Sequence, residues 1–436
     1  MSIHDIYWES LIIKNVKARM ILDSRGNPTV QVKVITEGYG VGIANAPSGA
    51  STGKNEAVEL RDGGKDFLGK GVSKAVENVN KVIAPAIIGM NAANQREIDR
   101  KMIEIDGTPN KSRIGGNAIV ATSLAVAKAA ASTLGLPLYM YLGGKAANIL
   151  PVPMLNVING GVHAGNKLDF QEFMIVPAGF KNFADALKAS VEIYHVLKSI
   201  IKEKYGSIAI NVGDEGGYAP PLERTIDALE LLLEAIRKAG YQPGDQVALA
   251  IDAASSRLYR EDKGVYLVDG EERSRDDMIA FYEKLIENYP IVSIEDPLHE
   301  EDFEGFHMMT RELGSRVLIV GDDLFTTNPS RLKLGIEKKA ANAILVKVNQ
   351  IGTLTETMDV VEIAHENDYR AIISHRSGET EDMAIADISV GLSTGLIKTG
   401  APARSERTCK YNRLLEIFEE LEKPRYLGFK VFPRKP

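Results

Sequence analysis

The sequence has few of the features that mark secreted or membrane proteins. Cys409 is the only cysteine among 436 residues, so no disulfide framework can form within one chain, which is typical of a reducing compartment. The start of the chain lacks a basic segment followed by an apolar one, and no apolar run reaches the roughly 18 residues of a membrane span. We therefore expect a cytoplasmic protein without a membrane partner.

An excess of positive charge is also missing. The formal net charge of −7 argues against general binding to nucleic acid or to anionic membranes. A local basic cluster can still bind a small phosphorylated molecule. Hydrophobic residues make up 44% and charged residues 25% of the chain, as in ordinary soluble globular proteins.

The first third of the chain reads as an α+β domain. Residues 30–35 alternate apolar and polar side chains, as a half-exposed antiparallel strand does. Strands first and helices afterwards are typical of this class. The helical patterns that follow cover residues 72–88, 95–104 and 116–135.

Two domains are expected from this change of pattern. We place an α+β N-terminal capping domain at residues 1–145, with 1–12 as an extension, and a β/α barrel catalytic domain at 146–436. A barrel of this kind takes up about 250 residues, so the length of the second part is suitable.

Apolar runs in the second part each end in a polar side chain, and the runs are about one strand-plus-helix unit apart. Because the carboxyl ends of the strands of a (β/α)8 barrel converge on one face, these side chains are expected to meet around one pocket. The polar residues are Asp252, Glu295, Asp322, Lys347, His375 and Lys398.

Three of these residues are carboxylates, which suggests a hard divalent cation. Mg²⁺ prefers oxygen ligands, and Asp252, Glu295 and Asp322 could supply part of its coordination sphere. Alternatively, each acid caps the following helix or pairs with a neighbouring base, but three in succession make this less favourable. Without a cluster of histidine and cysteine, zinc is not expected.

Lys347 lies within an apolar run, where a lysine is either buried beside a charge partner or functional. Burial and nearby cations lower the pKa of a lysine, so that it can act as a general base. The alternative is a lysine that extends out of the strand end into solvent.

Other candidate residues lie in glycine-rich or strand-start segments. Glu215 is flanked by glycines in 213–217, and from this motif alone an ordinary acidic turn is favoured. Glu172 is either a second acid or a solvated residue at the start of a strand. His163 lies on a glycine-hinged segment, as in a lid, or is a structural histidine.

Several segments offer groups for phosphate. The loop 47–54 is not a P-loop, because its glycines enclose three residues rather than four, but Ser51 could still bind a metal or a phosphate. Arg376 and Ser377 are suitable donors to phosphate, and Lys398 to a second anionic group. An ordinary surface ion pair is the alternative for Arg376.

Local signals also predict helix starts and one loop. Ser274 with Asp277, and Thr353 with Glu356, have the spacing of helix-capping pairs. The polar, turn-rich segment 255–275 is predicted to be a mobile loop.

Read together, ten segments resemble the enolase family. They occur in order over nearly the whole chain outside the first dozen residues. The segments are Ile21–Thr29, Pro47–Gly53, Asn159–Gly165, Gln171–Met174, Gly213–Gly217, Ser293–Pro297, Gly321–Asp323, Leu345–Gln350, Ser374–Glu381 and Ile397–Arg407.

The resemblance implies a lyase that reversibly dehydrates 2-phosphoglycerate to phosphoenolpyruvate in glycolysis and gluconeogenesis. Lys347 would remove the proton beside the carboxylate, and Glu215, supported by Glu172, would protonate the departing hydroxyl. The enolase superfamily is the standard case of a lysine or histidine base working with one or two Mg²⁺ ions, which stabilise the enolate.

The resemblance also implies two Mg²⁺ ions and a set of substrate contacts. Asp252, Glu295 and Asp322 would hold the first ion, and Ser51 would join the second, which arrives with the substrate. His163 would close over the site. The implied substrate contacts are His163, Gln171, Glu172, Glu295, Asp322, Lys347, His375, Arg376, Ser377 and Lys398.

The sequence departs from the family at a few positions. Val162 precedes the lid histidine where relatives often have a polar residue. Gln31 and Glu416 stand where many relatives carry a Glu–Arg pair between subunits. A homo-oligomer, dimeric or octameric, is still implied, but not the detail of its contact.

Two other functions fit the same residues less well. One is a non-catalytic binding protein that retains the enolase fold, although such a protein would not need Lys347, Glu215 and the metal acids together. The other is an acid–base lyase or racemase acting on non-phosphorylated hydroxy acids, against which Arg376 and Ser377 favour a phosphate.

Overall fold

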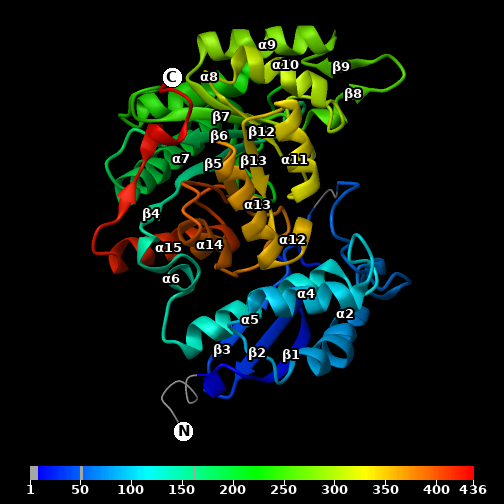
Figure 1. The fold of residues 1–436 in the computed structure, drawn as a ribbon. Helices are drawn as coiled ribbons and strands as arrows, with labels where there is room; N and C mark the ends of the chain where they lie inside the picture. The colour runs from blue at the N-terminus through cyan, green and yellow to red at the C-terminus, as the bar shows by residue number, and fades with distance from the viewer. Residues whose placement is uncertain (1–7, 50–52, 162–163) are drawn as a thin grey trace.

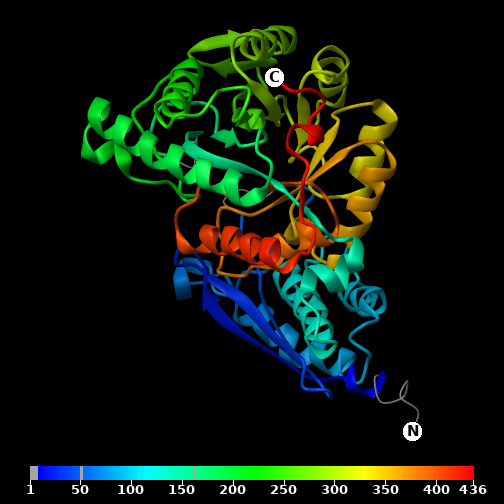
Figure 2. The same cartoon turned by 90° about the vertical axis from the view of Figure 1, so that its left-hand side faces the viewer.

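The computed structural model describes residues 8–49, 53–161 and 164–436. An antiparallel sheet backed by helices is followed by a closed barrel with helices around it (Figure 1). The two parts lie one above the other in both views (Figure 2). Helices α4 and α5 of the first part contact α12 and α13 of the second.

The N-terminal sheet has the strand order β1-β2-β3, and both pairs are antiparallel. Val30, Val32 and Val34 are buried while the residues between them are partly exposed, which confirms the predicted half-exposed strand. The strands are β1 (Ile13–Leu22), β2 (Pro28–Thr36) and β3 (Val41–Asn45), and the helices are α2 (Ser73–Asn78), α3 (Ala84–Ile87), α4 (Gln95–Asp106), α5 (Gly116–Thr133) and α6 (Leu138–Gly143).

Helix α5 covers the sheet at very close range. Its apolar side chains are nearly all buried, and it packs against β2 and β3. A side chain at Gly42 on β3 would place its Cβ 1.9 Å from the carbonyl oxygen of Ala125 on α5. Glycine is therefore required where the helix crosses this strand.

The barrel has eight strands in the order β11-β12-β13-β14-β15-β5-β6-β7. It departs from a regular (β/α)8 barrel at β6, which is antiparallel to both β5 and β7. The strands are β5 (Val152–Asn159), β6 (Glu172–Val176), β7 (Ala248–Asp252), β11 (Ile291–Glu295), β12 (Leu318–Gly321), β13 (Ala343–Val346), β14 (Arg370–Ser374) and β15 (Leu396–Lys398).

Helices surround the barrel, and their starts follow local signals. The capping box of Ser274 and Asp277 is present, and the Thr353 side chain accepts a hydrogen bond from the backbone N–H of Glu356, so both predicted starts are confirmed. The helices are α7 (Phe183–Tyr205), α8 (Thr225–Lys238), α9 (Arg275–Asn288), α10 (Phe303–Leu313), α11 (Pro329–Lys338), α12 (Val348–Ile351), α13 (Leu354–Glu366), α14 (Ala384–Gly391) and α15 (Ser405–Glu420). A two-stranded parallel pair, β4 (Ile149–Leu150) and β16 (Arg425–Tyr426), joins the two ends of the barrel segment.

The segment predicted to be a loop at 255–275 contains a small antiparallel sheet. Its strands are β8 (Tyr259–Arg260), β9 (Val265–Val268) and β10 (Glu271–Arg273). Tyr266 and Val268 alternate with more exposed neighbours and are buried. The composition of the segment is dominated by its polar turns, so a prediction from composition missed this short alternating strand.

Across the described ranges, no single helix is long and apolar enough to cross a membrane. Only α5 together with the segment Leu138–Ala146 meets the requirements of length and composition, as a pair bent by 91°.

The domain boundary near residue 145 stays a prediction.

Candidate active site

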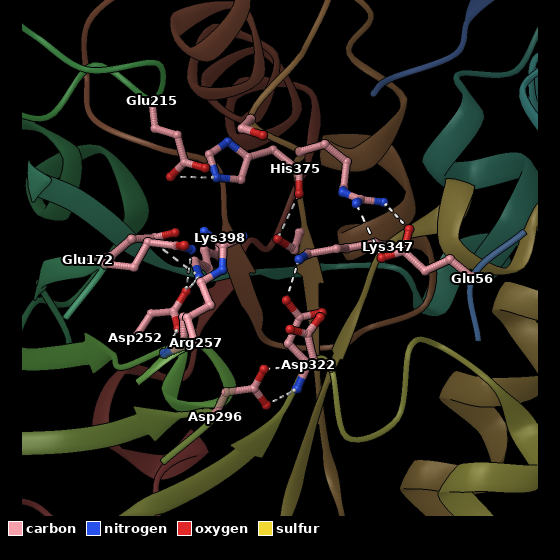
Figure 3. A pocket seen from close by; sticks show the side chains of 16 residues that line it. Glu56, Glu172, Glu215, Asp252, Arg257, Asp296, Asp322, Lys347, His375 and Lys398 are labelled. Carbon is pink, nitrogen blue, oxygen red and sulfur yellow. Dashed lines mark hydrogen bonds and ion pairs between the residues drawn. The ribbon is translucent and has the colours of Figure 1, made fainter. Parts of the chain in front are cut away.

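Five of the six polar residues at the strand ends line one pocket (Figure 3), and the sixth, Glu295, does not line it but contacts Lys398. Asp252 and Lys398 are the last residues of β7 and β15, and Asp322, Lys347 and His375 directly follow β12, β13 and β14. All are buried or nearly so. Of the predicted site residues, the pocket is lined by Gln171, Glu172, Glu215, Asp252, Asp322, Lys347, His375, Arg376, Ser377 and Lys398.

Glu172 reaches this pocket from the start of its strand rather than from the end. Because β6 runs against its neighbours, its first residue lies at the carboxyl end of the barrel, paired in register with Asp252. Glu172 is 2% exposed, which excludes the solvated strand-start alternative. Gln171, one residue earlier, donates to Asp252 Oδ2 at 3.3 Å.

Lys398 lies among three carboxylates. Its Nζ is 3.1 Å from Glu172 Oε2, 3.1 Å from Asp252 Oδ2 and 2.8 Å from Glu295 Oε2. Burial alone would lower the pKa of Lys398, but these carboxylates hold it well above its usual value. Lys398 is therefore a permanent cation at the centre of the pocket.

Lys347 pairs with Asp322 through a short contact between Nζ and Oδ2. Burial would lower the pKa of Lys347, but Asp322 raises it above the usual value, whereas Arg376 and Lys398 act in the opposite direction. The sequence suggested a lowered pKa, and the difference is due to this carboxylate. Lys347 is inside the pocket and does not extend out into solvent.

The acidic side chains fit a hard divalent cation. Burial and the nearby Asp252 carboxylate raise the pKa of Glu295 well above its usual value, as expected where like charges crowd without enough positive charge. Carboxylate oxygens are the ligands that Mg²⁺ prefers. Asp252, Glu295 and Asp322 lie at the ends of three adjacent strands, β7, β11 and β12.

A second cluster of acidic side chains shares Asp322 with the predicted metal ligands. Asp296, Asp322 and Asp323 each bring one carboxylate oxygen within 4.8 Å of the others. The Asp296 carboxylate accepts the backbone N–H groups of Asp322 and Asp323, both at 2.9 Å. Asp296 therefore shapes the turn that directs Asp322 into the pocket.

Arg376 and Ser377 both contact the N-terminal part of the chain, Arg376 through Glu56 and Ser377 through Ser24. The Arg376 guanidinium is 2.9 Å from Glu56 Oε2 and donates to Asn349 Oδ1 at 3.1 Å. These contacts hold the guanidinium in place beside the pocket. Ser51 and His163, which were predicted to bind the second metal and to form the lid, lie outside the described residues.

Glu215 and His375 lie next to each other in the pocket (Figure 3). His375 Nε2 is 3.3 Å from Glu215 Oε2, and the Asn156 side-chain amide donates to the same oxygen at 3.0 Å. Glu215 is 3% exposed, so the ordinary surface turn is excluded. Burial and the Glu215 carboxylate raise the pKa of Glu172 well above its usual value.

Burial lowers the pKa of His375 from 6.5 to about 4, which predicts a pH-dependent stability. The unfolded chain takes up a proton between these pH values and the folded chain does not, so stability is complete above pH 6.5 and is lost as the pH falls towards 4. We expect the free energy of unfolding of the wild type to fall by roughly 2–3 kcal/mol more than that of His375→Gln between pH 7.5 and 4.5. Urea titrations at both pH values measure this difference, and equal losses in the two proteins would contradict it.

Sequence reasoning missed several residues of the site. Asp296 and Asp323 directly follow predicted ligands, and these adjacent acids were an available signal. Arg257 follows β7 by five residues and also lines the pocket. Glu56 reaches the pocket from the N-terminal domain, and only its position shortly after the predicted Ser51 loop pointed to it.

Comparison with known proteins identifies the family. The model of the enolase N-terminal domain matches residues 13–142, and that of the enolase C-terminal TIM barrel domain matches residues 147–434. The chain is 61% identical to the enolase of Thermococcus gammatolerans over 423 residues, which are 97% of each chain. It is 62% identical to the enolase of Pyrococcus furiosus over 410 residues, covering 94% of this chain and 95% of that one. It is 60% identical to the enolase of Methanocaldococcus jannaschii over 420 residues, covering 96% and 98%. The chain therefore belongs to the enolase family.

Proposed function

We propose that Lys347 and Glu215 are the base and the acid of the enolase reaction in this protein, the reversible dehydration of 2-phosphoglycerate to phosphoenolpyruvate. The observation that carries the proposal is that both side chains line one pocket and enter it from different sides (Figure 3). A base and an acid placed in this way can act on the hydrogen and the hydroxyl of neighbouring carbon atoms.

Lys347 removes the proton on the carbon beside the substrate carboxylate. This proton is very weakly acidic, because its loss adds negative charge to a group that is already an anion. Lys398, held as a permanent cation, faces that charge and needs no rearrangement as the charge develops. Asp252, Glu295 and Asp322 would hold a divalent cation, which would supply further positive charge there and offset the carboxylate that pairs with Lys347.

Glu215 gives a proton to the departing hydroxyl. Glu172 supports this step from the same acidic cluster, where burial and the Glu215 carboxylate raise the pKa of Glu172. Both carboxyl groups are buried, which excludes competing transfer to bulk water.

Arg376 and Ser377 bind the phosphate. The guanidinium offers several N–H groups in one plane, which is suitable for phosphate oxygens, and Glu56 and Asn349 hold it in place. Gln171 and His375 line the same pocket as further contacts. Ser51 with a second Mg²⁺, and His163 as the lid, complete the proposal on the basis of the family resemblance.

Removal of divalent cations is expected to abolish product formation. Without added positive charge, the crowded carboxylates around Lys398 repel a substrate that carries a carboxylate and a phosphate. The measurement is the rise in ultraviolet absorbance as the enol phosphate forms, with Mg²⁺, with EDTA, and after Mg²⁺ is restored. Unchanged turnover in EDTA would contradict the metal proposal. No product from folded, Mg²⁺-supplied protein would instead favour a non-catalytic binding protein.

We propose the assembly and the location on the basis of the family resemblance. A cytoplasmic homo-oligomer, dimeric or octameric, is the expected form. Gln31 accepts from Arg19 at 2.6 Å, and Glu416 pairs with Arg413 at 3.0 Å, both within the chain. These residues therefore do not need the partner contact of the Glu–Arg pair that many relatives carry. Sedimentation equilibrium distinguishes a dimer from an octamer.

A further inference from the structure

Arg407 is a fully buried arginine that connects two segments of the site without lining the pocket. It lies near the start of α15. Its Nη1 is 2.6 Å from His375 Nδ1 and donates to the Arg376 carbonyl oxygen at 2.6 Å. Its Nη2 donates to the carbonyl oxygens of Asp214 at 3.0 Å and Ser377 at 2.7 Å. One guanidinium therefore joins the loop of Glu215 to the segment that follows β14.

The contact between Arg407 and His375 determines where the histidine proton resides. A guanidinium has only N–H donors and no acceptor, so His375 Nδ1 must accept at this contact. A neutral imidazole carries a single ring proton, which then lies on Nε2. This nitrogen is the one that faces Glu215 Oε2, at 3.3 Å.

Two N–H groups consequently lie near the same oxygen of Glu215. The Asn156 amide donates to Oε2 at 3.0 Å, and His375 Nε2 lies 3.3 Å from the same oxygen without forming a hydrogen bond. When Glu215 holds a proton, the oxygen that is approached by N–H groups is its accepting oxygen, and the proton lies on the other one. The proton of Glu215 therefore belongs on Oε1.

We propose that Arg407 is a positioning residue that holds His375 as the neutral, Nε2-protonated tautomer, so that Oε1 of Glu215 carries the proton used in the dehydration. This rests on the proposed role of Glu215 as the acid. Arg407 acts through His375 and does not touch the substrate.

Loss of Arg407 would change the chemistry of the pair rather than only its packing. The charged groups that face the His375 ring are Glu215, Arg407 and Glu379. Without the guanidinium, Nδ1 can also bind a proton, and the resulting imidazolium would pair with an ionised Glu215. The acid would then lack the proton that the hydroxyl needs.

The first test is nitrogen-15 NMR of the full-length protein with labelled histidine. The chain has 7 histidines, and His375→Gln assigns the signal of interest. We expect a protonated Nε2 and an unprotonated Nδ1 for His375, unchanged between pH 6 and 8. A protonated Nδ1, in either the other tautomer or an imidazolium, overturns the proposal. This test uses the wild type and does not depend on the folding of an Arg407 variant.

The second test compares Arg407→Lys with Arg413→Lys. Both change a largely buried arginine on α15, but Arg413 pairs with Asp387, away from the pocket. For Arg407→Lys we expect kcat to fall by roughly 10–100-fold with little change in KM, as for other residues that orient a functional histidine. Exchange of the substrate hydrogen beside the carboxylate with solvent should persist, because Lys347 is untouched. Equal losses of exchange and dehydration, or an equal loss of kcat in Arg413→Lys, would indicate a purely structural role and overturn the proposal.

A double variant separates the two proposals. If Arg407 acts through His375, Arg407→Lys has little further effect in a His375→Gln background, whereas independent effects multiply. If the effects of the two substitutions multiply, Arg407 does not act through His375, and its proposed role is overturned whatever the activity of a Glu215→Gln variant. If Glu215→Gln still dehydrates the substrate, Glu215 is not the acid, and that assignment is overturned even if NMR finds the expected tautomer of His375.

Discussion

Lys347→Ala is expected to lower turnover by at least roughly 10²–10⁴-fold, the usual contribution of a positioned base. No other lysine or histidine of the described pocket is available for the task. Lys398 is held as a cation by three carboxylates, and His375 lies beside Glu215 on the far side. Exchange of the substrate hydrogen with solvent should be lost together with dehydration, because both begin with removal of this proton.

The fold should survive this substitution. The backbone N–H of Lys347 donates to Thr327 Oγ1 at 2.9 Å, and alanine keeps this bond. Asp322 still accepts from Gln350 at 3.0 Å after its lysine partner is gone. Lys101→Ala, the same change at an exposed position of α4, is the control for activity and thermal stability. Activity of Lys347→Ala within tenfold of this control would exclude Lys347 as the base.

The strand-end residues were predictable because their signal is local. Each follows an apolar run, and the ends of parallel strands meet at one face whatever the details of packing. Asp252, Asp322 and Lys398 could therefore be placed in one pocket from the sequence. The antiparallel course of β6 has no such signal, so Glu172 remained undecided between a site residue and a solvated strand start.

Contacts between distant segments were not predictable from one sequence. Glu56 and Arg376 pair across the two parts of the chain, and no periodic pattern relates them. Arg407 belongs to a segment that resembles the enolase family, but its role depends on which nitrogen of His375 it touches. Orientation of this kind is decided by tertiary packing, which a pattern of apolar and polar residues does not encode.

Glu215→Gln is expected to separate the two halves of the reaction. Glutamine has no acidic proton to give, so dehydration should fall by roughly 10²–10⁴-fold. Lys347 is unchanged, so exchange of the substrate hydrogen with solvent should continue. Incubation with 2-phosphoglycerate in D₂O, followed by mass spectrometry of the substrate and by ultraviolet absorbance of the product, measures both rates in one sample. Glu223→Gln, the same change at an exposed position in the segment before α8, is the control.

The side-chain contacts of Glu215 make glutamine a conservative replacement. The amide oxygen can take the place of Oε2, where it accepts from Asn156 and faces His375 Nε2–H. The amide nitrogen then occupies the position of Oε1 and points at the leaving hydroxyl, where it can donate a hydrogen bond but cannot transfer a proton. Retained exchange with lost dehydration would thus assign the missing step to this one oxygen. Loss of both rates in a folded variant would mean that Glu215 is needed to bind the substrate, and rapid dehydration would mean that another group is the acid.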